Sequence, residues 1–394
     1  MKMRMTQLKT IADIQTGPFG SQLHKEDYVE TGTPIVTVEH LGNRVFTEQN
    51  LPRVSDSDKA RLIKYTLSTG DIVFSRVGSV DRCSYVDKSH DGWMFSGRCL
   101  RVRPTELVDS LYLYYYFCLE ETKQFVRNIA VGATMPSINT KLLGEVEIAL
   151  PDLNNQKRIA AVLSSLDDKI ENNQKLNDNL QQQLFSLYEN MATASPCLKE
   201  YTLSNLCDFQ EGYVNPPQTH PEYFDGEVKW LRAVDINESF IIETSRTLTK
   251  AGFESAKKSA LLFEPNTIAI SKSGTIGRLG IIADYMCGNR AVINIAPHDT
   301  NMLAFIYCFL KSKQREFPDM AVGSVQKNLY VSLLEPLSVS IPDNESLTAF
   351  NAVGASILGM IHNNCVENTD LANLRDTILP KLMSGEIDVS SVLL

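Results

Sequence analysis

Short runs of alternating apolar and polar residues occur in the same order in both halves of the chain. GDIVFSRVG at 70–78 and NTIAISKSG at 266–274 alternate in this way and end at glycine, which predicts strands. Similar β-rich runs, bounded by Gly, Asp and Asn, lie at 33–38 and 229–234. The pattern predicts two heads of similar architecture.

Longer amphipathic segments follow the strands in each half. Residues 111–125 and 302–317 have the apolar spacing and charged ends of helices. Each half then ends on a strand-like run closed by Pro-Asp, at 151–152 and 342–343. The heads are therefore predicted to mix strands with helices.

After each Pro-Asp the pattern changes to a long helix. Apolar residues step by four and three, the spacing of a coiled-coil seam. Gly and Pro are absent between Asp152 and Pro196, so the first helix is predicted to run for ~40 residues, or ~60 Å. The second contains Gly354 and Gly359 and is predicted to stop by Pro380. The predicted seam is Ile159, Leu163, Leu166, Ile170, Asn173, Asn177, Leu180, Leu184 and Leu187 in the first helix, and Phe350, Gly354, Ile357, Ile361, Asn364, Asn368, Leu371, Arg375 and Ile378 in the second.

Two asparagines interrupt each seam at matching positions. Asn173 corresponds to Asn364, and Asn177 to Asn368. If the helices pair antiparallel, these polar layers would lie near the middle of both helices, where they can meet and fix the register. The alternative is that they face solvent and the heptad frame slips there.

The whole chain is an internal repeat. Residues 6–20 superpose on 201–215, 75–82 on 271–278, and 131–152 on 322–343. A repeat of this length makes each copy a domain followed by a helical tail. The predicted boundaries are 1–150, 151–195, 196–341 and 342–394.

Composition is that of an ordinary globular protein. Of the 394 residues, 43% are hydrophobic and 22% are charged. No apolar run is long enough to span a bilayer, and eight scattered cysteines without a secretory signal indicate a reduced, cytoplasmic protein without contact to a membrane. The net charge is −9, but residues 342–394 alone hold two basic and seven acidic side chains. The heads are nearly neutral, so the total neither supports nor excludes nucleic-acid binding.

The chain has few candidate catalytic motifs. Asn215-Pro216-Pro217-Gln218 resembles the Asn-Pro-Pro-aromatic motif of amino-methyltransferases, but Gln218 replaces the aromatic residue, and a turn is the simpler interpretation. Residues 271–277 form a Gly-rich turn without the Gly-Lys-Ser/Thr of a nucleotide-binding loop. No histidines or cysteines have metal-ligand spacing, so neither a metal site nor a catalytic group is predicted.

Two pairs of loops are the candidates for DNA contact. The first pair carries a basic residue beside a glycine, Arg76 with Gly78 and Lys272 with Gly274, which suits phosphates or a guanine edge but also suits an exposed hairpin tip. The second pair, 132–139 and 323–329, has matching flanks and different tips, which indicates either reading loops on a shared scaffold or relaxed surface loops. The predicted DNA-binding residues are Gly17, Phe19, Ser21, Ser75, Arg76, Gly78, Arg98, Thr134, Ser137, Asn139, Ser271, Lys272, Ser273, Thr275, Arg290, Ser324, Gln326 and Lys327.

This layout resembles the specificity subunit of type I restriction-modification systems. The resemblance is carried by IADIQTGPFGSQL (11–23), GDIVFSRVGSV (70–80), GATMPSINTKLL (132–143), residues 150–173 and LPKLMSGEIDV (379–389). It implies an α+β fold with two target-recognition domains, each reading one half of a split site in double-stranded DNA. It also implies two helices that pack as an antiparallel coiled coil and separate the domains. Leu347, where the first copy has Gln156, is one departure from the repeat.

The resemblance also implies partners and cofactors. Two methylation subunits would dock on the helices and bind S-adenosylmethionine, and motor-nuclease subunits would use ATP and magnesium; the chain itself would be non-catalytic and hold no cofactor. The alternatives are a stand-alone adenine methyltransferase that uses Asn215, and a coiled-coil scaffold without a nucleic-acid role.

Overall fold

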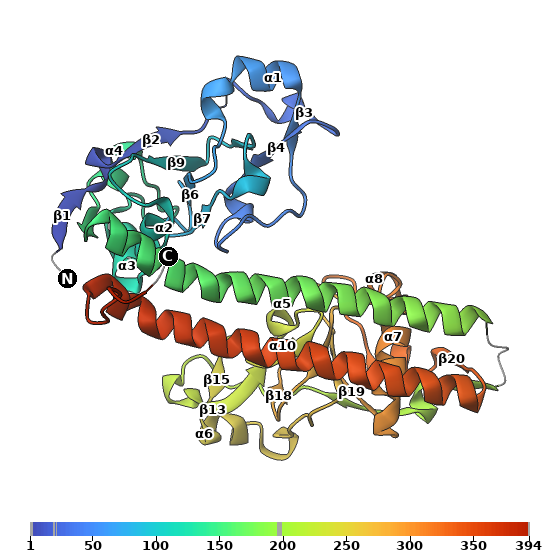
Figure 1. Cartoon of the computed structure of the whole chain (residues 1–394). Coiled ribbons are helices and arrows are strands. Elements are labelled where there is room, and N and C mark those ends of the chain that lie inside the picture. Colours follow the sequence, from blue (N-terminus) through green and yellow to red (C-terminus); the bar gives the residue numbers. More distant parts are fainter. Residues whose placement is uncertain (1–2, 19, 21, 195–198, 393–394) are drawn as a thin grey trace. The chain divides into compact units, whose positions relative to one another are not determined.

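The computed structural model describes residues 3–18, 20, 22–194 and 199–392. Contacts divide the chain into two compact units, Met1–Lys169 with Leu371–Leu394, and Ile170–Asp370. Two long helices, α5 (Leu153–Ala194) and α10 (Asn344–Ser384), each contribute to both units (Figure 1).

The first unit is built on an antiparallel four-stranded sheet in the order β2-β9-β6-β7. Its central strand β6 is buried along its whole length, since both sheet faces are covered. A second sheet has the order β3-β5-β4-β8, with β4 and β8 parallel, and β1 pairs with β10 in a two-stranded ribbon. The strands are β1 (Arg4–Gln7), β2 (Ala12–Thr16), β3 (Tyr28–Val29), β4 (Thr33–Val36), β5 (Arg53–Val54), β6 (Ile72–Ser75), β7 (Cys83–Tyr85), β8 (Met94–Phe95), β9 (Cys99–Pro104) and β10 (Glu147–Leu150).

The second unit repeats this plan. Its larger sheet has the order β12-β19-β16-β17-β14, its smaller sheet β15-β13-β18, and β11 pairs with β20. The central strand β16 is again buried throughout. The strands are β11 (Lys199–Thr202), β12 (Cys207–Glu211), β13 (Phe224–Leu231), β14 (Phe240–Ile241), β15 (Thr247–Leu248), β16 (Ile268–Ser271), β17 (Leu279–Ile282), β18 (Cys287–Gly288), β19 (Val292–Pro297) and β20 (Ser338–Ile341).

Short helices complete both units, and they correct two sequence predictions. The segments predicted as single helices at 111–125 and 302–317 are each broken in two. Leu119 has an extended backbone between α2 and α3, and α8 restarts with a proline in its first turn. The short helices are α1 (Asp56–Arg61), α2 (Ser110–Cys118), α3 (Glu120–Ile129), α4 (Thr140–Gly144), α6 (Lys250–Glu254), α7 (Leu303–Lys313), α8 (Phe317–Met320) and α9 (Val331–Leu334).

The Pro-Asp pairs cap the long helices. Asn155 N donates a 3.0 Å hydrogen bond to Asp152 Oδ1, and Ser346 N donates a 2.8 Å bond to Asp343 Oδ1. Gln156 adds a second attachment, because Asp109 N donates to its Oε1 at 2.8 Å. Leu347 replaces this polar link by apolar contact with the core of the second unit.

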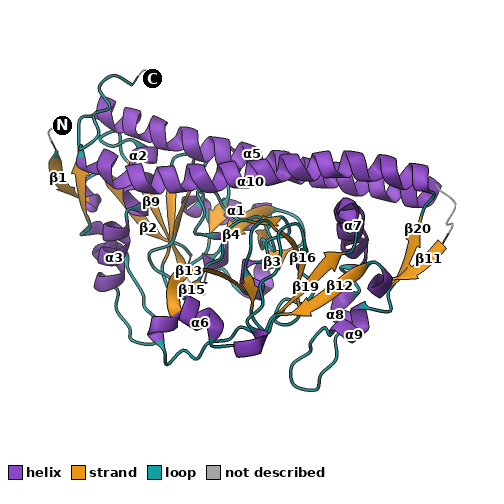
Figure 2. Cartoon of the chain, turned by 90° about the horizontal axis from the view of Figure 1, so that it is seen from below, coloured by secondary structure: helices purple, strands orange, loops and turns teal. Residues whose placement is uncertain are grey.

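The long helices pair antiparallel, as the fold class predicts, and run side by side in both views (Figures 1 and 2). Asn173 Nδ2 donates a 2.9 Å hydrogen bond to Asn368 Oδ1, and Asn364 Nδ2 donates a 2.8 Å bond to Asn177 Oδ1. The two asparagine layers therefore meet across the helix pair. Ile159, Leu163, Leu180, Phe350, Ile357 and Ile361 are buried, whereas Leu166, Ile170 and Leu371 are half-buried.

Two predictions about the long helices are wrong. Leu187 is 42% exposed, and Tyr188 takes the buried position, because an α-helix drifts from a strict seven-residue repeat. Helix α10 continues through Pro380 to Ser384. Leu379, Leu382 and Met383 of that last turn are buried in the first unit, and this packing outweighs the missing proline hydrogen bond.

Gly354 has a packing role in α10. A side-chain carbon there would lie 2.6 Å from Cβ of Ala304, so glycine is what allows α10 to lie this close to α7.

Candidate nucleic-acid interface

The loop after the central strand has the same construction in both units. Gly78 and Gly274 have positive φ angles of 76° and 78°. Ser75 Oγ donates to the carbonyl of Val77 at 2.8 Å, and Ser271 Oγ donates to the carbonyl of Thr275. Both serines are buried. Their prediction as DNA contacts is therefore corrected: these hydroxyls close the turn and do not face solvent.

The second loop, at 131–137 in the first unit and 322–328 in the second, is closed at its base by reciprocal backbone hydrogen bonds. Val131 and Ser137 exchange bonds of 2.9 and 2.8 Å, and Val322 and Asn328 exchange bonds of 3.0 and 2.9 Å. Between these clamps the residues 132–135 and 323–327 are exposed. The two units thus present loop tips on an equivalent base.

Backbone hydrogen bonds gather three loops around Arg76 and Lys272. Arg76 N donates to the carbonyl of Arg98 at 2.8 Å, and its own carbonyl accepts from Ile138 N at 2.9 Å. Lys272 N donates to the carbonyl of Ala291 at 2.7 Å, and its carbonyl accepts from Leu329 N at 2.9 Å. The same constellation therefore forms twice, from segments far apart in sequence.

The two cationic side chains at these centres already have partners. Arg76 Nη1 donates a 3.0 Å hydrogen bond to the carbonyl of Gly97. Lys272 Nζ lies 2.9 Å from Glu211 Oε1 and 4.8 Å from the centre of the Tyr330 ring. Both residues are half-buried, so they stabilise the loops and offer only part of their surface to a ligand.

Glycine at position 17 is required by close packing. A side-chain carbon at Gly17 would lie 2.1 Å from the carbonyl oxygen of Ser96, and one at Gly212 would lie 2.2 Å from that of Asn289. Gly17 is buried, which corrects its prediction as a DNA contact. Phe19 and Ser21 lie outside the described residues.

The remaining predicted residues differ in exposure. Ser137 and Asn139 hold local structure, through bonds to the carbonyl of Val131 at 3.1 Å and from Leu142 N at 2.9 Å. Ser273 is half-buried. The exposed set is Gly78, Arg98, Thr134, Asn139, Thr275, Arg290, Ser324, Gln326 and Lys327.

Sequence reasoning missed the residues that couple to Lys272. Tyr213 OH donates a 2.8 Å hydrogen bond to Glu211 Oε2, and this bond raises the pKa of the Tyr213 phenol. Tyr213 is 50% exposed. No local motif marks this group, because Glu211, the partner of Tyr213, meets Lys272 only through the sheet, where β19 pairs with both β12 and β16.

A cluster of arginines and aromatic rings in the second unit was also missed. The Arg246 guanidinium lies 4.2 Å from the Phe224 ring centre, and that of Arg232 lies 5.6 Å from that of Trp230. Arg246 Nη1 also donates a 3.0 Å hydrogen bond to Gln218 Oε1. The Asn-Pro-Pro-Gln segment is thus held against this cluster as a loop.

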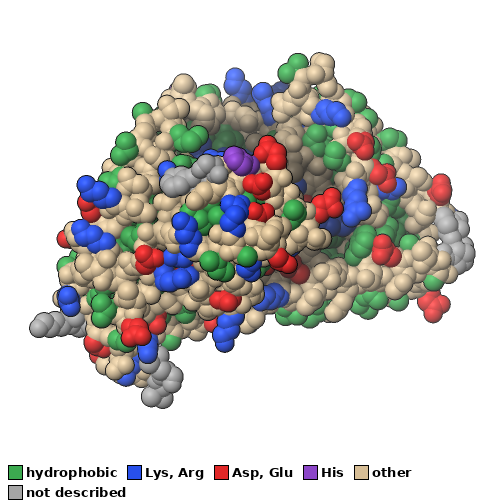
Figure 3. Space-filling model, turned by 90° about the horizontal axis from the view of Figure 1, so that it is seen from above, with side chains coloured by type: hydrophobic (Ala, Val, Ile, Leu, Met, Phe, Trp, Pro, Cys, Tyr) green, Lys and Arg blue, Asp and Glu red, His purple; other side chains and the backbone are tan. Residues whose placement is uncertain are grey.

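Buried or half-buried arginines of the first unit pair with carboxylates of the same unit. Arg103 forms two 2.7 Å hydrogen bonds to the buried carboxylate of Asp71, and Arg101 lies 2.7 Å from Asp13. On the face shown in Figure 3, basic and acidic side chains are interspersed. The exposed basic groups at the loops are therefore the candidates for attracting phosphate.

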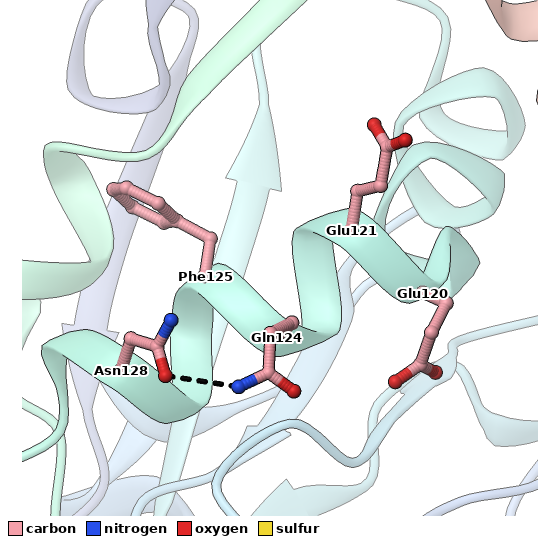
Figure 4. A pocket seen from close by; sticks show the side chains of 5 residues that line it. All are labelled: Glu120, Glu121, Gln124, Phe125 and Asn128. Atoms are coloured by element: carbon pink, nitrogen blue, oxygen red, sulfur yellow. Dashed lines mark hydrogen bonds between the residues drawn. The ribbon is translucent and has the colours of Figure 1, made fainter.

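A shallow hollow beside α3 has the wrong charge for such a role. It is lined by Glu120, Glu121, Gln124, Phe125 and Asn128, with a 2.9 Å hydrogen bond from Gln124 Nε2 to Asn128 Oδ1 (Figure 4). Two carboxylates at its rim repel phosphate. Within the described ranges, no group of three or more His, Cys, Asp and Glu side chains can hold a metal ion, and no helix there is long and apolar enough to cross a membrane.

Comparison with known proteins identifies the family. The sequence model of the type I restriction modification DNA specificity domain matches twice, at residues 2–182 and 198–369. The type I restriction enzyme MjaIX specificity subunit of Methanocaldococcus jannaschii is 27% identical over 73% of this chain and 72% of its own length. The HindI specificity subunit of Haemophilus influenzae is 22% identical over 82% and 88%.

A solved structure has the same fold. The crystal structure of a type I restriction-modification S subunit from M. genitalium matches with a TM-score of 0.56 and 19% identity, over 97% of this chain and 96% of that one. The duplicated family match and the duplicated fold agree. The chain belongs to the family of type I restriction-modification DNA specificity subunits.

Proposed function

We propose that this chain reads a two-part DNA site, with one half-site for each head. The observation that carries the proposal is the loop constellation, which has the same backbone hydrogen bonds in both units and different residues at its tips. A common frame suits the contacts that position a protein on the duplex, and different tips suit different base sequences. The heads would therefore bind similarly and read different letters.

The exposed tip residues have suitable chemistry. Arg98, Arg290 and Lys327 can contact phosphates or the acceptor edge of guanine, and Gln326 can pair with adenine. Tyr213 adds an exposed ring with a hydroxyl group beside the second constellation. Because the charge of each head is nearly balanced, this local grouping carries the affinity.

The long helices would dock two methylation subunits. Val353, Met360 and Leu374 of α10 are 49%, 44% and 49% exposed, and their spacing in multiples of seven puts them on one helix face. Leu176 of α5 is 48% exposed at the corresponding heptad position. An exposed apolar stripe of this kind suits a partner protein with an apolar surface.

Cofactor chemistry would belong to those partners. The methylation subunits would bind S-adenosylmethionine and modify adenine, and motor-nuclease subunits with ATP and magnesium would join through the complex. Double-stranded DNA would be the ligand of this chain.

The helices would also set the gap between the half-sites. Helix α5 has 42 residues, which gives a length of about 63 Å, and α10 has 41. One turn of duplex is about 34 Å, so helices of this length span one to two turns.

Selection of bound duplexes from a random pool tests the reading role. We expect the chain with its methylation partners to enrich two short motifs at a constant distance, with binding that weakens steeply as salt rises. A variant in which Ser324, Gln326 and Lys327 are replaced by alanine should relax the motif of one half-site and retain the other. Arg98→Ala changes an exposed cation of the other head and should act on the other half-site. Loss of both motifs in a folded variant would contradict one head per half-site, and salt-insensitive, unselective binding would indicate a scaffold.

A further inference from the structure

One ion pair between the long helices has no counterpart in the other copy of the repeat. Arg375 Nη1 lies 2.6 Å from Asp167 Oδ1, and Tyr115 OH donates a 2.7 Å hydrogen bond to Asp167 Oδ2. All three residues belong to the first unit, where Asp167 is 5% exposed and Arg375 is half-buried. The contact therefore joins α5 to α10 through a largely buried charge.

The repeat identifies the corresponding contact in the second unit. Moving 191 positions along the sequence takes Asp167 to Leu358, and moving back by the same number takes Arg375 to Leu184. Leu184 and Leu358 are 1% and 5% exposed and lie in the same apolar cluster. The corresponding pair of helix positions is therefore charged in one unit and apolar in the other.

The bonds between asparagines lack this difference. The Asn173–Asn368 and Asn177–Asn364 contacts are exchanged by the same shift of 191 positions. Two copies of α5 paired antiparallel would set Asn173 against the second copy's Asn177, which again joins amide to amide. These amide-to-amide bonds can fix register, but by themselves they do not distinguish α5 from α10. A second, smaller difference lies beside them, because Asn173 Nδ2 also donates a 2.7 Å hydrogen bond to Glu367 Oε2, and Glu367 corresponds to Leu176 in the other copy.

The charged contact does distinguish the two helices. Two copies of α5 would set Asp167 against the second copy's Leu184, and two copies of α10 would set Arg375 against Leu358. Two α5–α10 pairs contain two Asp167–Arg375 ion pairs, whereas one α5–α5 pair and one α10–α10 pair contain none. In the like pairs each of these charged side chains faces a leucine, which is strongly unfavourable for a buried charge. Arg375 can reach water with its long side chain, so the larger penalty falls on Asp167.

We propose that Asp167 and Arg375 are a pairing code, which makes α5 pair with α10 and not with another α5. The ion pair thereby prevents two copies of the chain from associating through α5–α5 or α10–α10 contacts. The first half is synthesised before the second, and its apolar seam is made before α10 exists. Asp167 makes that seam a poor partner for the same seam on a neighbouring chain until Arg375 has been made.

Native mass spectrometry of the nicked protein tests this proposal. A specific protease site is inserted between Ala194 and Lys199, the folded protein is cleaved, and the halves are exchanged in moderate urea and dialysed. Pairs of two N-terminal halves or two C-terminal halves should be at least about a hundredfold rarer than random association would produce. In the nicked variant Y115F/D167L/R375L, which places leucine at both positions as in the second unit, pairs of two identical halves should become much more frequent than with the wild-type halves. Random pairing of the wild-type halves, or strict unlike pairing in the variant, would overturn the proposal.

Urea unfolding of the intact chain gives a second, independent readout. Asp167→Leu and Arg375→Leu should each lower the unfolding midpoint more than Y115F/D167L/R375L does. Asp167→Leu leaves the Tyr115 hydroxyl without its acceptor and Arg375 with only Asp376, and Arg375→Leu leaves the buried Asp167 carboxylate without its counter-charge. Asp178→Leu is the matched control, since this carboxylate of α5 is exposed and should leave the unfolding midpoint little changed. Additive effects of Asp167→Leu and Arg375→Leu would show that the pair is uncoupled, and the pairing code would be rejected.

Discussion

At the scale of single residues, exposure separates those that shape the loops from those that can touch DNA. Ser75, Ser271 and Gly17 are predicted DNA contacts, yet all three are buried. A sequence motif gives the position of a turn but not the direction of its side chains. Arg98, Arg290 and Lys327 are exposed, and their contact with DNA stays a prediction.

Lys327→Ala should weaken DNA binding without changing the fold. Because Lys327 is an exposed cation on a loop tip, removing a phosphate contact there should reduce the slope of log K against log salt by about 1. Binding titrations over a salt series measure this slope. Lys258→Ala, an exposed lysine of the same unit outside the loops, is the control and should leave the slope unchanged. If both variants lowered the slope equally, the salt dependence would come from the overall charge of the unit and not from a phosphate contact at Lys327.

Asp71→Ala should destabilise the first unit by about 2 kcal/mol, a value reduced because Arg103 is partly exposed. The buried carboxylate accepts both Arg103 bonds and a 2.7 Å bond from Ser68 N, so its loss leaves Arg103 without its counter-charge and Ser68 N without this acceptor. Urea denaturation measures the change. An unfolding free energy equal to that of the wild type would contradict a structural role for this pair.

At the scale of elements, the sequence predicts well where local pattern and packing agree. Helix α5 begins and ends close to the predicted positions because its seam, its Asp152 cap and the absence of Gly and Pro all favour one helix. The prediction fails where distant packing decides. Helix α10 passes Pro380 because its last turn is buried in the first unit, and Leu119 breaks a helix that periodicity alone would continue.

The caps of α5 and α10 should make both helices sensitive to acid. Backbone hydrogen bonds from Asn155 and Ser346 hold the pKa values of Asp152 and Asp343 below their ordinary value of 3.8. A carboxyl group whose pKa is lowered by folding contributes stability above its unfolded pKa, and that contribution is lost as pH falls through the folded value.

Asp343→Asn should therefore keep the cap and remove part of the acid sensitivity below about pH 4, whereas Asp343→Ala should lower the melting temperature already at neutral pH. Thermal unfolding followed by circular dichroism across pH measures both effects. Equal melting temperatures for the Ala variant and the wild type at neutral pH would show that the cap does not stabilise α10.

At the scale of the whole molecule, the repeat is the feature from which most could be predicted. Matching seams and asparagine layers predicted the helix pair, and matching flanks predicted equivalent heads. The hydrogen-bond constellation around Arg76 and Lys272 was not predictable, because it depends on which loops the sheets bring together. The difference between the Asp167–Arg375 ion pair and the buried leucines Leu184 and Leu358 at the corresponding positions likewise needed the pairing of the helices to be known.

Matched insertions of one heptad into both helices should lengthen the DNA gap. Seven residues added after Leu176 and seven after Val366 preserve the seam and add about 10 Å, or about three base pairs. The half-site sequences should remain the same. Enrichment sequencing measures the gap, and an unchanged gap in a folded variant would show that helix length does not set the spacing. The insertion in α5 alone is the control and should disrupt pairing with α10.

Methylome sequencing of cells that carry this chain with its methylation partners measures both half-sites and their spacing at once. We predict new adenine methylation at two short defined sequences separated by a constant run of unspecified bases. In a variant with alanine at Ser324, Gln326 and Lys327, one of the two sequences should relax while the other and the spacing persist. A single continuous motif, or simultaneous loss of both half-sites in a complex that still assembles, would contradict a specificity subunit with one reading head for each half-site.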